Sequence, residues 1–167
     1  MDKITYSDSY LSEILETVST IAMVGVSPNI MRPSHFAMKY LKTKGYRIIP
    51  INPAIAGQQL MGEPVYASLH EVPHGFDMVD IFRNSLAAGK ISNEAIELKQ
   101  SKGIKVIWMQ LGVRNQKAET RATKAGLKVV MDRCPKIEFG RLYGELSWSG
   151  VNSKIVSSKR PYLRKLN

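Results

Sequence analysis

Residues 20–41, TIAMVGVSPNIMRPSHFAMKYL, decide the fold. An apolar run typical of a buried strand leads to Gly25, and a helical pattern begins at Pro33. Such a turn places the N-terminus of a helix, with its partial positive charge and unpaired N–H groups, directly after a strand. Residues 17–62 contain no acid but five bases: Arg32, Lys39, Lys42, Lys44 and Arg47. We therefore expect phosphate at this turn, although the net charge of +10 could by itself produce an acid-free stretch.

Three similar joints divide the rest of the chain. KGYRII (44–49), KGIKVI (102–107) and AGLKVV (125–130) each contain a glycine followed by β-branched residues. A glycine just after a helix adopts a left-handed conformation without steric cost, and the β-branched run favours a strand buried on both faces. Asn115 is a suitable N-cap for the last helix. These patterns predict helices over residues 8–18, 34–44, 91–102 and 116–125, and strands over residues 20–26, 46–51, 78–82, 104–110 and 127–132.

This alternation predicts an α/β fold. Right-handed crossovers restrict it to a Rossmann-like, doubly wound, five-stranded parallel sheet in three layers, and we predict the strand order 3-2-1-4-5. The connection 52–77 shows little periodicity, and so long a connection is often functional, so we expect it to border the ligand. A length of 167 residues with 44% hydrophobic content favours a single domain over residues 1–140, with residues 141–167 as its basic extension.

Ligands of such sheets bind beyond the carboxyl ends of the strands. The turn GVSPN lacks the second and third glycines of a dinucleotide fingerprint, and Asn52 stands where an NAD site has an acid for the ribose. A basic surround without that acid suits NADP or the 3′-phosphorylated ADP of coenzyme A. The residues at strand ends are Gly25 to Ser34, Asn52 and Pro53, Phe82 and Arg83, Gln110 to Gly112, and Cys134 to Lys136.

Five motifs in order, GVSPNIMRPS, IPINP, DIFRNS, WMQLGV and MDRCPKIE, closely resemble the stand-alone CoA-binding domain family. That family is related to the N-terminal domain of succinyl-CoA synthetase alpha subunits. The resemblance spans roughly residues 10–140, and GELSWSGVNSKIVSSKR is similar to extended bacterial members. It implies a CoA-binding, Rossmann-like fold, and the leading hypothesis is a cytosolic protein that binds coenzyme A or acyl-CoA as a carrier, sensor or subunit. An NADP-dependent oxidoreductase stays open as an alternative.

The resemblance also implies roles for individual residues. The first turn would hold the phosphates, the residues after the second strand would flank adenine and ribose, and Gln110 would lie nearer the pantetheine. Arg83 follows an apolar strand, where a guanidinium needs an anionic partner. Trp108 lies inside the strand VIWMQ and is more typical of a core residue. The full set expected to bind coenzyme A is Gly25, Val26, Ser27, Arg32, Ser34, Asn52, Pro53, Phe82, Arg83 and Gln110.

Cys134 is the one reactive candidate. Its neighbours Arg133 and Lys136 predict a lowered thiol pKa. Two hypotheses stay open: a thiol that forms a mixed disulfide with CoA or carries an acyl group, and a buried, inert thiol. The sequence shows no catalytic triad, carboxylate pair or metal-ligand spacing, and the ligase relatives take their phosphorylated histidine from a second domain. We expect a binding protein rather than a self-sufficient catalyst, and a protein partner could supply catalytic parts.

The two ends of the chain differ in charge. The N-terminus is polar and acidic, and no apolar run approaches the roughly 18 residues of a membrane span, which predicts a cytoplasmic protein. After Glu145 there are five basic residues and no acid, so an RNA-associated protein is a third hypothesis. No RNA-binding motif accompanies this tail, so nucleic acid is not the expected partner. The tail, with Trp148, could instead form a homodimer contact, and the oligomeric state stays open.

Overall fold

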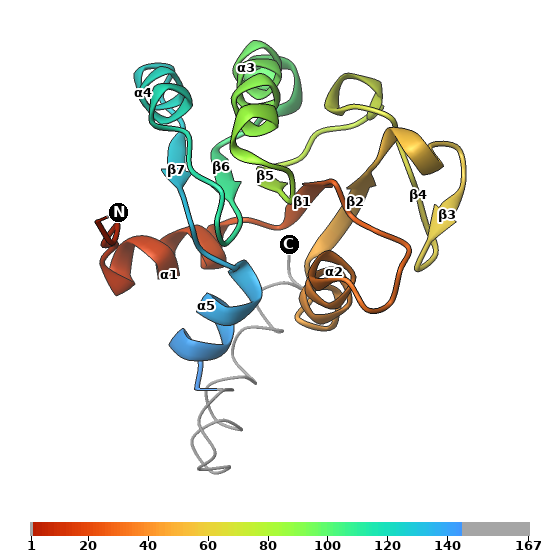
Figure 1. Ribbon diagram of the computed structural model, residues 1–167, viewed down its shortest axis with the longest axis horizontal. Helices are drawn as coiled ribbons and strands as arrows, with labels where there is room; N and C mark the ends of the chain where they lie inside the picture. The colour runs from red at the N-terminus through yellow and green to blue at the C-terminus, as the bar shows by residue number, and fades with distance from the viewer. Residues whose placement is uncertain (1, 145–167) are drawn as a thin grey trace.

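The computed structural model describes residues 2–144, which form a five-stranded parallel sheet and five α-helices (Figure 1). The strands of this sheet are β1 (Thr20–Val24), β2 (Arg47–Ile51), β5 (Met78–Ile81), β6 (Val106–Met109) and β7 (Lys128–Val130). The helices are α1 (Asp8–Thr17), α2 (Pro33–Thr43), α3 (Ser85–Lys102), α4 (Gln116–Lys124) and α5 (Pro135–Leu142). The connection after β2 contains the short strands β3 (Gln59–Leu60) and β4 (Glu63–Pro64) and two 3₁₀ turns, Pro53–Ile55 and Leu69–Glu71. The predicted α/β class and parallel sheet are confirmed.

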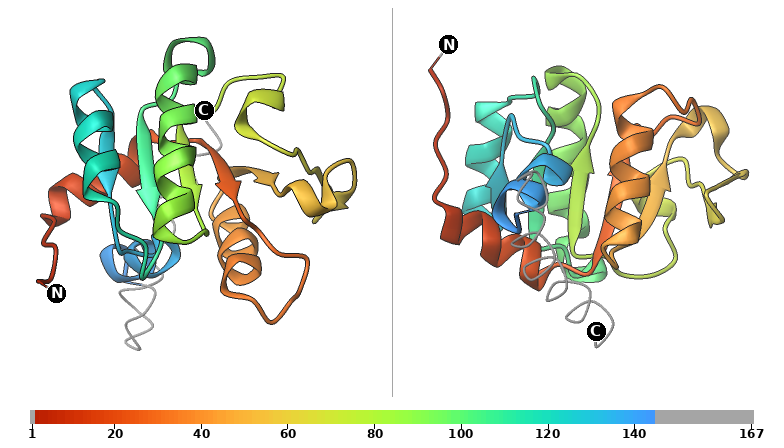
Figure 2. Two further views of the ribbon diagram at one scale, coloured as in Figure 1. Left: turned by 45° about the horizontal axis from the view of Figure 1, so that its top comes forward. Right: turned by 90° about the horizontal axis from the view of Figure 1, so that it is seen from below.

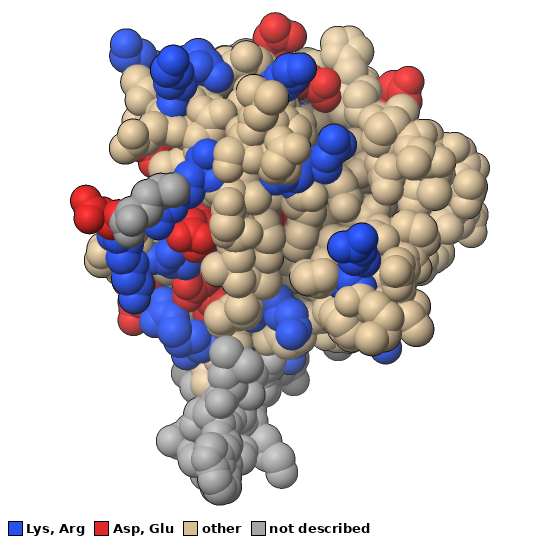
Figure 3. All heavy atoms as spheres, viewed as in Figure 1, with Lys and Arg blue, Asp and Glu red and all other residues tan. Residues whose placement is uncertain are grey.

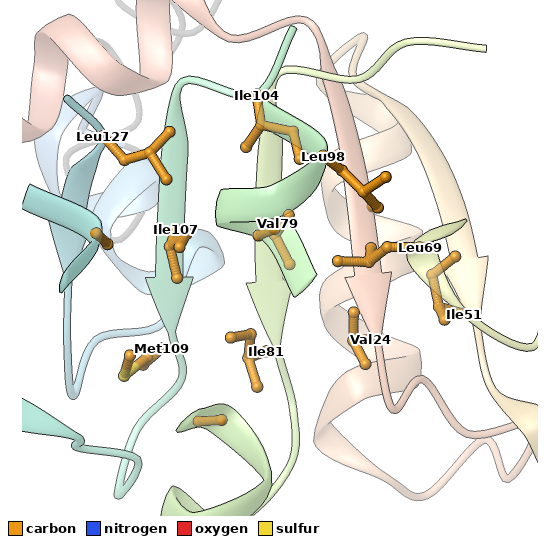
Figure 4. Close-up of a cluster of buried hydrophobic side chains, with 14 of the residues drawn as sticks. Val24, Ile51, Leu69, Val79, Ile81, Leu98, Ile104, Ile107, Met109 and Leu127 are labelled. Atoms are coloured by element: carbon orange, nitrogen blue, oxygen red, sulfur yellow. The ribbon is translucent and has the colours of Figure 1, made fainter. Parts of the chain in front are cut away.

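The helices form two outer layers, with α1, α2 and α5 on one face of the sheet and α3 and α4 on the other (Figure 2). Because successive strand side chains point to opposite faces, each strand contributes to both hydrophobic clusters. Figure 4 shows the cluster under α3, in which Val24, Val79 and Ile107 come from three neighbouring strands and Leu98 comes from the helix. Trp108 is fully buried in the opposite cluster, as predicted, and its Nε1 donates to the carbonyl of Arg133 at 2.8 Å.

The strand order is β2-β1-β5-β6-β7, so the predicted order 3-2-1-4-5 is wrong in the position of the third strand of the sheet. This strand, β5, pairs with β1, not with β2. The outer edge of β2 is occupied by the connection itself, because Asn52 N–H donates to the Tyr66 carbonyl and Tyr66 N–H donates to the Pro50 carbonyl. Tyr66 thus pairs with the end of β2 at the open edge of the sheet. The order of connection reverses between β1 and β5, which is where such sheets bind ligands.

Turn and cap residues explain most of the element bounds. The glycines at the three joints, Gly45, Gly103 and Gly126, have φ values of 91°, 77° and 88°, as expected of left-handed helix ends. Asn115 caps α4 as predicted, with Oδ1 accepting from Ala118 N–H at 2.9 Å. Helix α3 begins six residues earlier than the predicted 91, because Asn84 provides an N-cap that accepts from Ala87 N–H at 2.8 Å. Helix α5 was not predicted.

Two predictions concern the membrane and the basic tail. Within residues 2–144, no helix combines the length and the apolar character that a membrane crossing requires. The predicted basic extension is described only as far as residue 144. The basic residues that follow Glu145, and Trp148, lie outside the described residues.

Candidate functional site

A pocket of about 790 Å³ lies at the carboxyl edge of the sheet. Its walls come from the β1–α2 turn, the β5–α3 turn, the loop after β6 and the N-terminal end of α5. These segments meet at the reversal point between β1 and β5, where two neighbouring crossovers leave the sheet in opposite directions and open a crevice. The position is the one that the fold predicts for a ligand.

The β1–α2 turn depends on Gly25, which has φ +89°. A Cβ atom at this position would lie 2.6 Å from the carbonyl oxygen of Phe82 and 2.8 Å from Cδ of Arg83. Only glycine lets the turn approach the end of β5 so closely. The turn is further fixed by Ser34 in the first turn of α2, whose Oγ accepts from Ser27 N–H at 3.0 Å. Both serines line the pocket.

Among the residues that the structure describes, the lining of the pocket includes three cationic side chains, Arg32, Arg83 and Lys136, and no carboxylate. Arg32 and Arg83 are exposed, and within residues 2–144 neither guanidinium forms an ion pair or a hydrogen bond. The ammonium of Lys136 lies 5.8 Å from the ring centroid of Tyr40. Figure 3 shows Lys and Arg side chains spread over much of one face of the protein, with Asp and Glu side chains among them. The pocket is therefore suited to an anion.

The same pocket has a substantial apolar surface. Phe36, Leu111 and Ile137 line it, and their exposed fractions of 49%, 55% and 42% are high for such side chains. We use the name exposed rim for these three residues together with Arg32 and Arg83. Single exposed apolar side chains are common, but three around one basic pocket form a contiguous amphipathic surface. A ligand that fits it has an anionic group and a less polar arm.

Two buried polar residues, Gln110 and Cys134, line the pocket as well, each only 7% exposed, and we call them the buried floor. Oε1 of Gln110 has no hydrogen-bond partner among the described residues. A carbonyl oxygen that is desolvated and unpaired costs free energy, so this atom is suited to accept a hydrogen bond from a ligand.

The pKa of the Cys134 thiol is raised by burial, and the backbone N–H of Ile137 and the Gln110 side chain act in the opposite direction. The prediction that adjacent positive charge lowers this pKa is therefore wrong. Arg133 is engaged elsewhere: its guanidinium donates to the Ile4 carbonyl and lies 3.4 Å from Glu138. Arg133 is therefore adjacent to Cys134 in the sequence, but its positive charge is not directed at the Cys134 sulfur.

Asp80, in the middle of β5, is fully buried and interacts electrostatically with Cys134. Neither of its carboxylate oxygens has a hydrogen-bond partner among residues 2–144. Burial raises its pKa well above the usual value of 3.8. Sequence analysis did not single out this residue, although an acid within the apolar run MVDIF is itself a signal, because a buried charge needs compensation.

The structure brings most of the predicted coenzyme A residues into one pocket, but not all of them. Residues that line it are Gly25, Ser27, Arg32, Ser34, Phe82, Arg83 and Gln110. Val26 is fully buried, and neither Asn52 nor Pro53 lines the pocket. Asn52 joins the end of β2 to the turn, since its Nδ2 donates to the Val26 carbonyl at 2.9 Å. None of residues 52–77 lines this pocket, so the expectation that the connection borders the ligand stays a prediction.

Sequence analysis missed four lining residues, Phe36, Asn84, Val113 and Ile137. Ile137 lies in α5, which begins at Pro135. A proline followed by helical spacing is a start signal that could have found this helix. Within residues 2–144, no three His, Cys, Asp or Glu side chains are grouped so that they could hold a metal ion.

The architecture and the pocket together define a class, the three-layer α/β domains with a basic pocket at the reversal point of a parallel sheet. Comparison with known families is more specific. Residues 19–140 match the model of the CoA binding domain family, and the chain belongs to this family.

Relatives support the assignment. The uncharacterized protein YneT of Bacillus subtilis is 34% identical over 131 residues, which cover 78% of this chain and 93% of that protein. The crystal structure of Prb, a redesigned form of the PH1109 protein, is 33% identical with a TM-score of 0.79, over 88% of this chain and 99% of Prb. A dinucleotide-forming acetyl-coenzyme A synthetase from Ca. Korarchaeum cryptofilum shares the fold, with 24% identity and a TM-score of 0.58 over 70% of this chain and 26% of the enzyme.

Proposed function

We propose that the protein binds coenzyme A or an acyl-CoA in the pocket between β1 and β5 and acts as a carrier, a sensor or a subunit. One observation carries the proposal: within residues 2–144, guanidinium groups without an ion-pair partner, a helix N-terminus and an apolar wall line a single pocket that contains no carboxylate. Coenzyme A combines a phosphorylated nucleotide with a long, weakly polar pantetheine arm. The family match supports the same ligand class.

The phosphates are assigned to the β1–α2 turn. Ser27, Ser34 and the N-terminal end of α2 supply hydrogen-bond donors and a partial positive charge, and Arg32 and Arg83 supply full charges. The pantetheine arm follows Leu111 and Ile137 toward the buried floor. Val26, Asn52 and Pro53 stay predicted contacts for any part of the adenosine that extends beyond the pocket.

The lining residues supply binding more readily than catalysis, because the part of the lining that the structure describes contains no carboxylate and its thiol, Cys134, has a raised pKa. A protein partner that contributes a reactive group would complete an acyl-CoA reaction. A cytosolic site of action agrees with the single cysteine of the chain, since secreted domains usually pair theirs.

Isothermal titration with CoA, NADP and ADP at two salt concentrations tests the proposal. We expect CoA to bind most tightly, and its affinity to fall as salt rises because the rim cations are exposed. Arg83→Ala should weaken CoA binding by about 10- to 100-fold, the usual contribution of a hydrogen bond to a charged group. Lys90→Ala removes the same charge from an exposed site on α3 outside the pocket and should have little effect.

Other outcomes discriminate between the hypotheses. NADP binding above CoA would move the protein to the oxidoreductase class. Absence of binding by all three nucleotides would overturn the proposal, and membership of the family would then account for the fold alone.

A further inference from the structure

We infer that Cys134 is an attachment site for the sulfur of coenzyme A: through exchange with CoA disulfide it forms a mixed disulfide with one CoA held in the pocket. The inference rests on the proposed function, since the nucleotide part of the ligand must first bind at the exposed rim. It adds a covalent, reversible state of the protein that binding alone does not imply.

The sulfur of Cys134 lies where a ligand can reach it. Cys134 is the N-cap of α5 and lines the pocket together with Gly25, Arg83 and Gln110. Three groups near the sulfur favour its thiolate form: the N–H groups of Ile137 and Lys136 and the side chain of Gln110. They only partly offset the effect of burial, so the thiol is protonated at rest, and the same groups favour the negative charge that develops on the sulfur during attack.

A second observation points independently to the ligand. Gln110 is more than nine-tenths buried, lines the same pocket and presents an Oε1 atom without a partner among the described residues. The pantetheine arm ends in an amide, and two methylene groups separate its N–H from the sulfur. A hydrogen bond from this amide to Oε1 of Gln110 would satisfy the buried acceptor. The same hydrogen bond would bring the ligand sulfur close to Cys134.

The exchange balances without any further reactant. The Cys134 thiolate attacks one sulfur of CoA disulfide, and the bond from Sγ to that sulfur forms while the original sulfur–sulfur bond breaks. Cys134 is oxidised, and the departing CoA leaves as a thiolate that takes up the proton lost by Cys134. Because Cys134 is the only cysteine of the chain, no second thiol of the same molecule can resolve the product. The mixed disulfide persists until an external thiol reduces it.

Binding at the rim should make the reaction selective. A buried, protonated thiol reacts slowly with disulfides that collide at random. A disulfide anchored by its phosphates presents its sulfur at a high effective concentration. Glutathione disulfide, which has no phosphate, is the appropriate comparison.

The test incubates the full chain with CoA disulfide and follows the intact mass without reductant. We expect a gain of one CoA moiety that dithiothreitol removes, and no gain in Cys134→Ser. Glutathione disulfide at the same concentration should react at least about tenfold more slowly, and excess ADP should slow only the reaction with CoA disulfide. Gln110→Leu should reduce this preference for CoA disulfide, whereas Gln100→Leu, at an exposed position of α3, should leave it unchanged.

Titration of Cys134→Ser with CoA separates the two proposals. If this variant binds CoA but the parent protein forms no adduct, the inference is overturned and the proposed function stands. Equal rates with the two disulfides would also overturn it, since the thiol would then be accessible but not guided. If neither protein binds CoA, both proposals fail.

Discussion

The exposed rim and the buried floor of the pocket differ in how far their polar groups are exposed to water. Arg32 and Arg83 on the rim keep their charges in water, where an unpaired cation costs little. Gln110 and Cys134 on the floor are removed from water, and an unpaired oxygen there is costly. The difference indicates that the rim attracts and holds an anion, while the floor selects the group at the other end of the ligand.

The largest expected effect comes from a substitution of Gly25 in the β1–α2 turn, beside the exposed rim. Gly25→Ala places a methyl group 2.6 Å from the Phe82 carbonyl in a backbone conformation with φ +89°, so the turn must move away from β5. We expect the free energy of unfolding to fall by roughly 3 kcal/mol, the sum of left-handed strain and overpacking, and CoA binding to be lost. Urea denaturation and titration measure the two effects.

Gly57→Ala is the matched control. Gly57 has the same φ of +89°, but no atom lies within 4 Å of its added Cβ. It should cost only the backbone strain, about 1 kcal/mol, and leave the binding of CoA intact. Equal losses in both variants would show that conformation alone, and not the contact with β5, explains the need for Gly25.

The second effect concerns Asp80, a buried carboxyl that interacts electrostatically with Cys134 of the buried floor. Burial raises the pKa of Asp80, so the folded protein keeps this proton to a higher pH than the unfolded chain does. The favourable contribution is complete below the usual value of 3.8 and is lost as the pH rises toward the raised value. Asp80→Asn cannot ionise and should be more stable than the parent at pH 8 by about 1–3 kcal/mol, with little difference at acid pH. Thermal unfolding over a pH series measures this difference.

Asp77, three residues earlier, provides a control of opposite sign. Its Oδ2 accepts from the Ser19 N–H at 2.6 Å and from the Thr20 N–H at 2.9 Å. Asp77→Asn weakens these bonds and should lower the stability by about 1–2 kcal/mol. A loss of stability in Asp80→Asn at pH 8 would mean that the Asp80 carboxylate has a stabilising partner.

The β1–α2 turn was predictable from the sequence because its information is local. Gly25, Arg32 and Ser34 belong to one strand, turn and helix, and their pattern alone predicts an anion site. The position of β5 was not predictable in this way, since it depends on which edge of β2 is already covered by Tyr66, a contact between distant segments. The floor was predicted in part: Gln110 and Cys134 follow strands, but the burial that raises the Cys134 pKa comes from tertiary packing.

The smallest expected effect tests whether the apolar side of the exposed rim contacts the pantetheine arm and not the nucleotide. Ile137 lines the pocket on the apolar side and is 42% exposed, so a ligand arm that covers it gains only part of a full side-chain burial. Ile137→Ser should therefore weaken CoA binding by about three- to tenfold, equivalent to roughly 0.7–1.4 kcal/mol. ADP, which has no pantetheine arm, should bind both proteins equally. Leu86→Ser, at an exposed position of α3 outside the pocket lining, is the matched control and should change neither affinity. Equal weakening of CoA and ADP by Ile137→Ser would place the nucleotide, and not the arm, against α5, and the assignment of the two ends of the ligand would have to be reversed.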